Sequence, residues 1–106
     1  MTTSTKFNST TITASGRILL RDDSIPTVNE SFDVALKGTL GGGTLSLQVS
    51  FEETPVLATD AHWITINGAN ALAVDRVYSV EVLKYKAIAV CLAGATTPSL
   101  TAIWPK

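Results

Sequence analysis

The chain has 106 residues, of which 45% are hydrophobic and 16% charged, and its formal net charge is -1 at pH 7. This length suits one domain with a single core and leaves no room for a second. The eight basic residues form no stripe along the sequence, which argues against direct binding of nucleic acid. A charged fraction below the usual value of about a quarter indicates a surface partly covered by partner proteins.

Cys91 is the only cysteine, so the chain can form neither an intrachain disulfide nor a zinc site of several thiolates. The first residues, MTTSTKFNSTT, lack the apolar core of a signal peptide, and no apolar run approaches the length of a membrane span. We therefore expect a protein made in the cytoplasm, not secreted through a signal peptide and not bound to a membrane.

Residues 1–11 are mostly Thr, Ser and Asn, with one aromatic side chain at Phe7. Two interpretations remain open for this segment, a flexible tail or an arm that adds a strand to a neighbouring subunit. Thr-rich sequences suit the second, in which Phe7 and Thr10 would contact the partner. We expect a single β domain to occupy residues 12–106.

The first strand signal inside that domain follows Ser15-Gly16, with Ile18 and Leu20 on one face and Leu19 and Arg21 on the other. Residues 21–26 predict a turn, because Asp and Ser side chains cap backbone amides and proline cannot extend a central strand. The adjacent carboxylates in this turn lack the spacing of a calcium loop.

Two alternating segments, 31–40 and 44–53, flank a run of three glycines at 41–43. Glycine tolerates positive φ, so we expect a tight turn that joins these segments as an antiparallel hairpin. A phosphate-binding loop is excluded here because a strand, not a helix, follows the glycines. The apolar positions that should face a core are Phe32, Val34, Leu36, Leu45, Leu47, Val49 and Phe51.

Residues 61–67 predict a strand that contains Trp63 and the only histidine, His62. No serine or cysteine shows a nucleophile motif, and Glu52 and Glu53, consecutive on a strand end, point to opposite faces. We therefore expect no catalytic residue, no metal site and no cofactor, and a protein that is not an enzyme.

Residues 76–83 alternate again, whereas residues 85–93 are apolar on both faces. A strand of that second kind is normally covered on both sides. One face of it consists of Ala87, Ala89, Cys91 and Ala93. Two coverings remain open for these four residues, an interface with another subunit or a loop of the same chain.

The last strand, at residues 99–104, places Leu100, Ala102 and Trp104 on one face. Together, six to eight short strands without any helical periodicity predict an all-β fold, an antiparallel β-sandwich or jelly roll. Exposed sheet edges and sparse charge favour a homo-oligomer, and a trimer is our expectation.

Four parts of the sequence carry a family resemblance: the Gly-rich segment GTLGGGTLSLQVS at 38–50, the tryptophan strand at Trp63, the strand at 78–82, and KAIAVCLAGATTPSLT at 86–101. Together they resemble small tailed-bacteriophage virion proteins, commonly β-sandwiches. The chain departs from that pattern at 52–62, where such proteins often have an Asp-Gly-Gly-Thr turn directly before the tryptophan.

The resemblance implies a structural virion component, such as a capsid decoration (cement) protein or a head or tail accessory protein. Its partner would be the major capsid protein or another virion protein, and its location the capsid surface. The residues also leave open a carbohydrate-binding or host-recognition module. In that alternative, Trp63, His62 and Tyr85 would form the stacking site.

Overall fold

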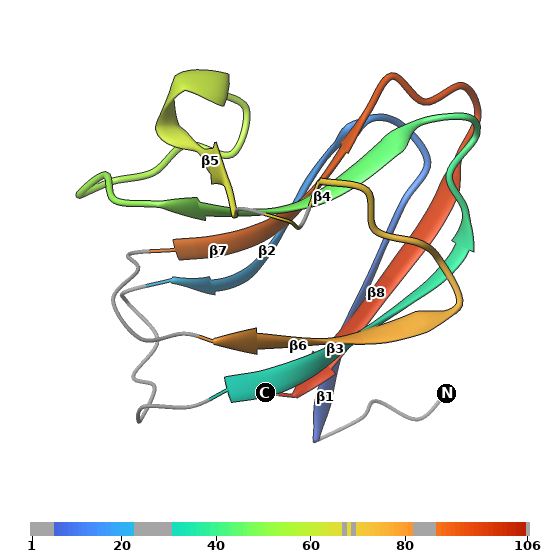
Figure 1. Ribbon diagram of the computed structural model, residues 1–106, viewed down its shortest axis with the longest axis horizontal. Helices are drawn as coiled ribbons and strands as arrows, with labels where there is room; N and C mark the ends of the chain where they lie inside the picture. The colour runs from blue at the N-terminus through green and yellow to red at the C-terminus, as the bar shows by residue number, and fades with distance from the viewer. Residues whose placement is uncertain (1–5, 23–30, 67, 69, 82–86, 106) are drawn as a thin grey trace.

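The computed structural model describes residues 6–22, 31–66, 68, 70–81 and 87–105. These residues form eight strands in two four-stranded antiparallel sheets, which confirms the all-β sandwich (Figure 1). The predicted turn at 21–26 lies mostly outside the described residues, and Tyr85 lies outside them entirely. The strands are β1 (Phe7–Ile12), β2 (Gly16–Asp22), β3 (Ser31–Thr39), β4 (Thr44–Ser50), β5 (Ile64–Thr65), β6 (Arg76–Glu81), β7 (Ala87–Ala93) and β8 (Ser99–Pro105).

The strand pairing follows that of one long antiparallel ribbon folded over on itself. β1 pairs with β8, β2 with β7, β3 with β6 and β4 with β5. Two further pairs, β3 with β8 and β4 with β7, complete sheet A (β1-β8-β3-β6) and sheet B (β2-β7-β4-β5). This arrangement is a jelly roll, in which successive strands alternate between the sheets except at the closed end of the ribbon, β4 to β5.

The hydrophobic core lies between the two sheets and is built from the alternating positions of their strands. Every second residue of a strand points to the same face, so a single alternating segment supplies two or three core side chains. The buried core residues are Ile18, Leu20, Phe32, Val34, Leu36, Leu45, Leu47, Val49, Val80, Ile88, Val90, Leu92, Leu100, Ala102 and Trp104. Phe51, expected among them, is exposed because it follows the end of β4.

Arg21 is buried beside Leu20, although strict alternation puts the two on opposite faces. The register of β2 against β7 shifts between Leu19 and Arg21, and this irregularity breaks the alternation. The Arg21 guanidinium stacks over the Phe32 ring at 4.5 Å and donates a hydrogen bond to the carbonyl of Pro105. It thereby ties sheet B to the end of β8 in sheet A.

The glycine run does not join a hairpin, and that part of the sequence prediction was wrong. Gly41 and Gly42 form the expected turn with φ of +60° and +79°, but β3 lies in sheet A and β4 in sheet B. Turn chemistry fixes only the local bend, whereas long-range pairing with β8 and β7 assigns the flanking strands to their sheets. The connection at residues 94–98 also crosses between sheets, from β7 in sheet B to β8 in sheet A.

Residues 7–11 were expected to belong to a flexible or partner-ordered arm, but in the structure they form part of a strand. These residues belong to β1, which pairs with β8 of the same chain from Phe7 opposite Pro105 to Ile12 opposite Leu100. The Thr-rich segment thus adds a strand to a sheet edge, as the arm interpretation expected, but the edge is β8 of the same chain and not one of a neighbouring subunit. Residues 1–5 lie outside the described part of the chain.

Candidate functional site

The outer face of sheet B is covered by the chain itself. After β4, residues 51–66 turn back over this face and return to the sheet as β5; we call this segment the cap (Figure 1). It contains one turn of 3-10 helix, η1 (Asp60–His62), and only two residues of the strand predicted at 61–67 are found as a strand. The cap distinguishes the outer face of sheet B from that of sheet A, and for this reason we describe it as the candidate site.

Trp63 is the apolar anchor of the cap. Its side chain packs on Ala87, Ala89 and Leu19, and only 6% of the tryptophan remains exposed. The indole N–H donates a hydrogen bond to the carbonyl of Val56 at 2.9 Å, so the polar end of the ring is satisfied as well. Alanine suits positions 87 and 89 because its small side chain leaves room for the indole ring above β7.

The alanine face of β7 is therefore covered by a loop of the same chain, one of the two coverings that the sequence left open. Ala87 and Ala89 are 1% and 0% exposed and do not reach the surface, so in this conformation they cannot form the partner interface expected for them. Cys91 is half-buried, and Ala93 at the end of β7 is exposed.

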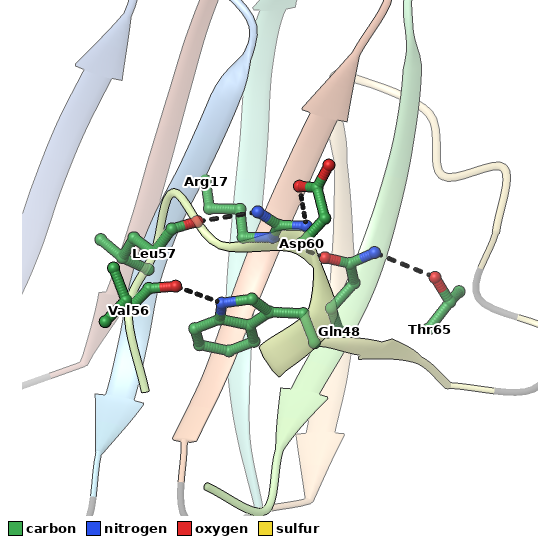
Figure 2. Close-up of polar contacts among 7 residues, drawn as sticks. Arg17, Gln48, Val56, Leu57, Asp60 and Thr65 are labelled. Atoms are coloured by element: carbon green, nitrogen blue, oxygen red, sulfur yellow. Dashed lines mark hydrogen bonds and ion pairs between the residues drawn. The ribbon is translucent and has the colours of Figure 1, made fainter. Parts of the chain in front are cut away.

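Arg17 is the polar anchor of the cap (Figure 2). From β2 its Nε donates to Gln48 Oε1 at 2.7 Å and its Nη1 to the Leu57 carbonyl at 2.7 Å. Nη2 forms an ion pair with Asp60 at 2.9 Å. The guanidinium also lies 5.7 Å from the centre of the Trp63 ring. A single side chain thus connects β2, β4 and two points of the cap.

The Arg17 side chain is 7% exposed, whereas that of Asp60 is 92% exposed. An ion pair with one partner in water contributes less than about 1 kcal/mol, because solvent screens it. The hydrogen bond to Gln48 is part-buried, whereas that to the Leu57 carbonyl is exposed. Leaving the Gln48 acceptor without its donor would cost roughly 1–3 kcal/mol. We infer that the part-buried bond to Gln48, whose amide in turn reaches Thr65 of the cap, contributes more to stability than the exposed ion pair.

Further hydrogen bonds stiffen the cap. Gln48 extends the hydrogen-bond network to β5, because its Nε2 donates to Thr65 Oγ1 at 3.1 Å (Figure 2). Within the cap, the Val56 amide donates to His62 Nδ1 at 3.0 Å, and the Thr59 amide donates to the Val56 carbonyl at 3.1 Å. The cap is therefore a bonded unit and not an open loop.

Cys91 lies beneath this network, opposite Arg17 on β2 and opposite Ser46 on β4. Burial raises the pKa of its thiol, while the charge of Arg17 and a hydrogen bond with Ser46 act in the opposite direction. The thiol is thus less acidic than a free cysteine, and it behaves as a small apolar group under the cap.

Two of the three residues proposed for ligand stacking, Trp63 and His62, are engaged within the cap, and the third, Tyr85, lies outside the described residues. Trp63 is buried under the cap with its N–H occupied, and His62 uses Nδ1 to accept the Val56 amide. Of the proposed partner contacts, Phe7 and Thr10 are exposed on β1. Among the described residues, no group of three or more His, Cys, Asp and Glu side chains could hold a metal ion.

Sequence reasoning missed Arg17, Gln48 and Asp60. The only signal for the first two was a long polar side chain at an outward position of a strand, which is also what a solvated face contains. Their joint role depends on the cap folding back, and no local pattern predicts that.

The cap segment contains most of the exposed large apolar side chains of the described residues. Among the described residues, six large hydrophobic side chains are exposed, and four belong to this segment, with exposures between 37% and 58%. They are Phe51, Val56, Leu57 and Ile64. The cap thus carries most of the exposed apolar side chains of the described chain on a backbone that is fastened to sheet B.

The fold and the cap define this chain as a jelly-roll protein with one sheet covered by its own β4–β5 connection. The sequence matches no known protein-family model and no curated protein. Within the described residues, no helix has the length and apolar character needed to cross a bilayer.

Proposed function

We propose that this chain is a non-enzymatic structural protein of a virion, of the capsid-decoration type, and that it attaches to the capsid through the cap. The observation that carries this proposal is the group of exposed apolar side chains on the cap, Phe51, Val56, Leu57 and Ile64. Exposed apolar side chains concentrated in one segment can form a protein-binding surface when they lie together. The partner is the major capsid protein or another virion protein.

The bonding of the cap favours this role. Arg17 and Trp63 fix the segment before any partner is present, so attachment would order few additional side chains and little backbone. A decoration protein also has to bury enough area for a stable contact, roughly 1,600 Å² in a typical interface. The cap can supply the apolar centre of such an interface, with Glu52, Glu53 and Asp60 at its polar rim.

The jelly-roll topology and the sequence resemblance to phage virion proteins support the same class. Jelly rolls recur in viral capsid proteins, but also in lectins and cupins, so the fold alone does not assign a function. Among these classes we favour the capsid proteins, because Trp63, a tryptophan that could have stacked on a sugar, is buried beneath the cap.

The experiment is co-sedimentation with purified capsids of the encoding phage. A Val56→Asp/Leu57→Asp variant keeps the backbone carbonyls that bind Trp63 and Arg17, and changes only exposed side chains. We expect capsid affinity to fall by at least about tenfold, since two apolar contacts would be replaced by unpaired charges. Ala71→Asp, an exposed alanine outside the cap, is the matched control and should bind like the wild type. Equal binding of the cap variant would refute attachment through the cap.

A further inference from the structure

The outer face of sheet A has no cap among the described residues, and its composition follows from the register. Side chains alternate between the two faces of a strand, so the neighbours of the core residues Leu36 and Ala102 point outward. Across the four strands, Ser9 lies beside Ile103, Ile103 beside Ala35, and Ala35 beside Val77. We call these four residues the outer row.

The outer row is mainly apolar and accessible. Val77 is 63% exposed, the highest value among the large hydrophobic side chains of the described chain, and Ile103 and Ala35 are half-buried. No segment of the described chain lies over this face in Figure 1, where sheets A and B enclose the core and the cap stands beyond sheet B. The face therefore presents a mainly apolar strip on the side of the molecule away from the cap.

Two opposite charges flank the outer row on β3. Asp33 lies two residues before Ala35 and Lys37 two residues after it, so both side chains share the outer face. Both residues are exposed, and Asp33 Oδ1 accepts a hydrogen bond from Ser79 Oγ at 2.9 Å, which holds the carboxylate on this face. The row thus separates a negative position from a positive one.

We propose that this face packs against the same face of a second copy of the chain, about a two-fold axis that runs along the outer row. This axis reverses the direction of β3 in the second copy. It therefore places Asp33 of each copy opposite Lys37 of the other, while the apolar side chains of the row meet their own counterparts. A two-fold axis parallel to the strands would instead set like charges against each other.

Charge complementarity therefore selects both the occupant and its orientation. A two-fold interface uses the same patch on both copies, so it must be complementary to itself. The outer row with its flanking charges meets that condition, and matched charges across an interface fix its register. This inference is independent of the proposed function, because the cap lies on the opposite side and stays accessible in the dimer.

The test is sedimentation velocity on the full chain over a range of concentrations, with a charge-swap series. We expect a concentration-dependent dimer for the wild type. Lys37→Asp and Asp33→Lys should each weaken dimerisation by about tenfold or more, because each sets like charges against each other twice. The double variant Asp33→Lys/Lys37→Asp should dimerise nearly as well as the wild type, since the pairs are restored in reverse.

A variant in the outer row provides a second measurement that does not depend on charge pairing. Val77→Asp changes an exposed residue and should also abolish the dimer while the fold is kept, as judged by circular dichroism. A wild type that stays monomeric, a trimer, or single charge variants that dimerise like the wild type would each overturn the inference. Failure of the double variant to recover would do the same.

Discussion

Arg17 is the polar residue on which the cap depends most. Arg17→Met keeps a long apolar side chain but leaves Gln48 Oε1 and the Leu57 carbonyl without their donor. We expect a loss of about 1–2 kcal/mol in the free energy of unfolding, because the part-buried Gln48 acceptor loses its hydrogen bond, whereas the exposed Leu57 carbonyl can bond to water. Urea unfolding measures this loss as a shift of the midpoint.

Asp60→Asn is the matched control for Arg17. It removes the charge from the 92% exposed partner of the ion pair and leaves the hydrogen bonds of Arg17 to Gln48 and to the Leu57 carbonyl intact. We expect it to cost less than about 1 kcal/mol. A cost equal to that of Arg17→Met would mean that the ion pair, and not the part-buried bond to Gln48, accounts for the contribution of Arg17.

Cys91 reports on the cap through its reactivity. Burial raises the pKa of its thiol, and only the thiolate reacts with iodoacetamide, so the folded protein should react more slowly than the unfolded chain. The half-maximal rate should also lie at higher pH in the folded state, because a raised pKa delays ionisation as pH increases. Alkylation rates from about pH 7 to about pH 10, measured with and without urea, test this.

Trp63→Ala extends the same measurement. Removing the indole opens the covering of Ala87 and Ala89 and hydrates the surface around Cys91. Alkylation should then be faster at each pH, and stability should fall by about 3–5 kcal/mol. Unchanged reactivity in a variant that remains folded would show that the cap does not shield the thiol.

The crossings between sheets are the elements that set the jelly roll apart from a stack of hairpins. At one of them the Thr96 amide donates to the Gly41 carbonyl at 2.9 Å, and a Cβ on Gly41 would collide with the Thr96 carbonyl. Two crossings, residues 40–43 and 94–98, thus pack backbone against backbone. The two backbones can approach this closely because the glycines have no side chains.

Gly41→Ala should therefore destabilise the fold by at least about 2 kcal/mol, since a positive φ and a backbone collision act together. Gly42→Ala is the control, because Gly42 also has a positive φ but no atom within 4 Å of the added Cβ. It should cost only about 1 kcal/mol. Thermal unfolding of both variants gives the comparison, and equal losses would contradict the packing argument.

At the scale of the whole molecule, the alternating segments predicted the strands and the core well. Phe32, Val34 and Leu36 were assigned to the core from period two alone, and all three are buried. The partners of the strands were less predictable: the glycine turn suggested a hairpin, while β3 pairs with β8, about sixty residues further along the chain. Pairings of that range depend on the complete set of strands, which local patterns do not contain.

The candidate site was predicted only in part, for the same reason. The alanine face of β7 indicated a second covering, and the structure provides one, but Trp63 reaches it only because the cap folds back over sheet B. Arg17 and Gln48 gain their role from the same long-range contact. A local pattern marks which surface has to be covered, and the tertiary fold decides what covers it.

The proposed function makes the two sides of the molecule unequal: the cap meets the capsid and the outer row of sheet A does not. Hydroxyl-radical footprinting of the free and the capsid-bound protein tests this most directly, because it reads the accessibility of individual side chains. The account predicts that Phe51, Val56, Leu57 and Ile64 become protected on capsids, while Ala35 and Val77 keep the oxidation that they show in the free protein. Bound protein whose cap side chains oxidise as fast as in the free state would contradict it.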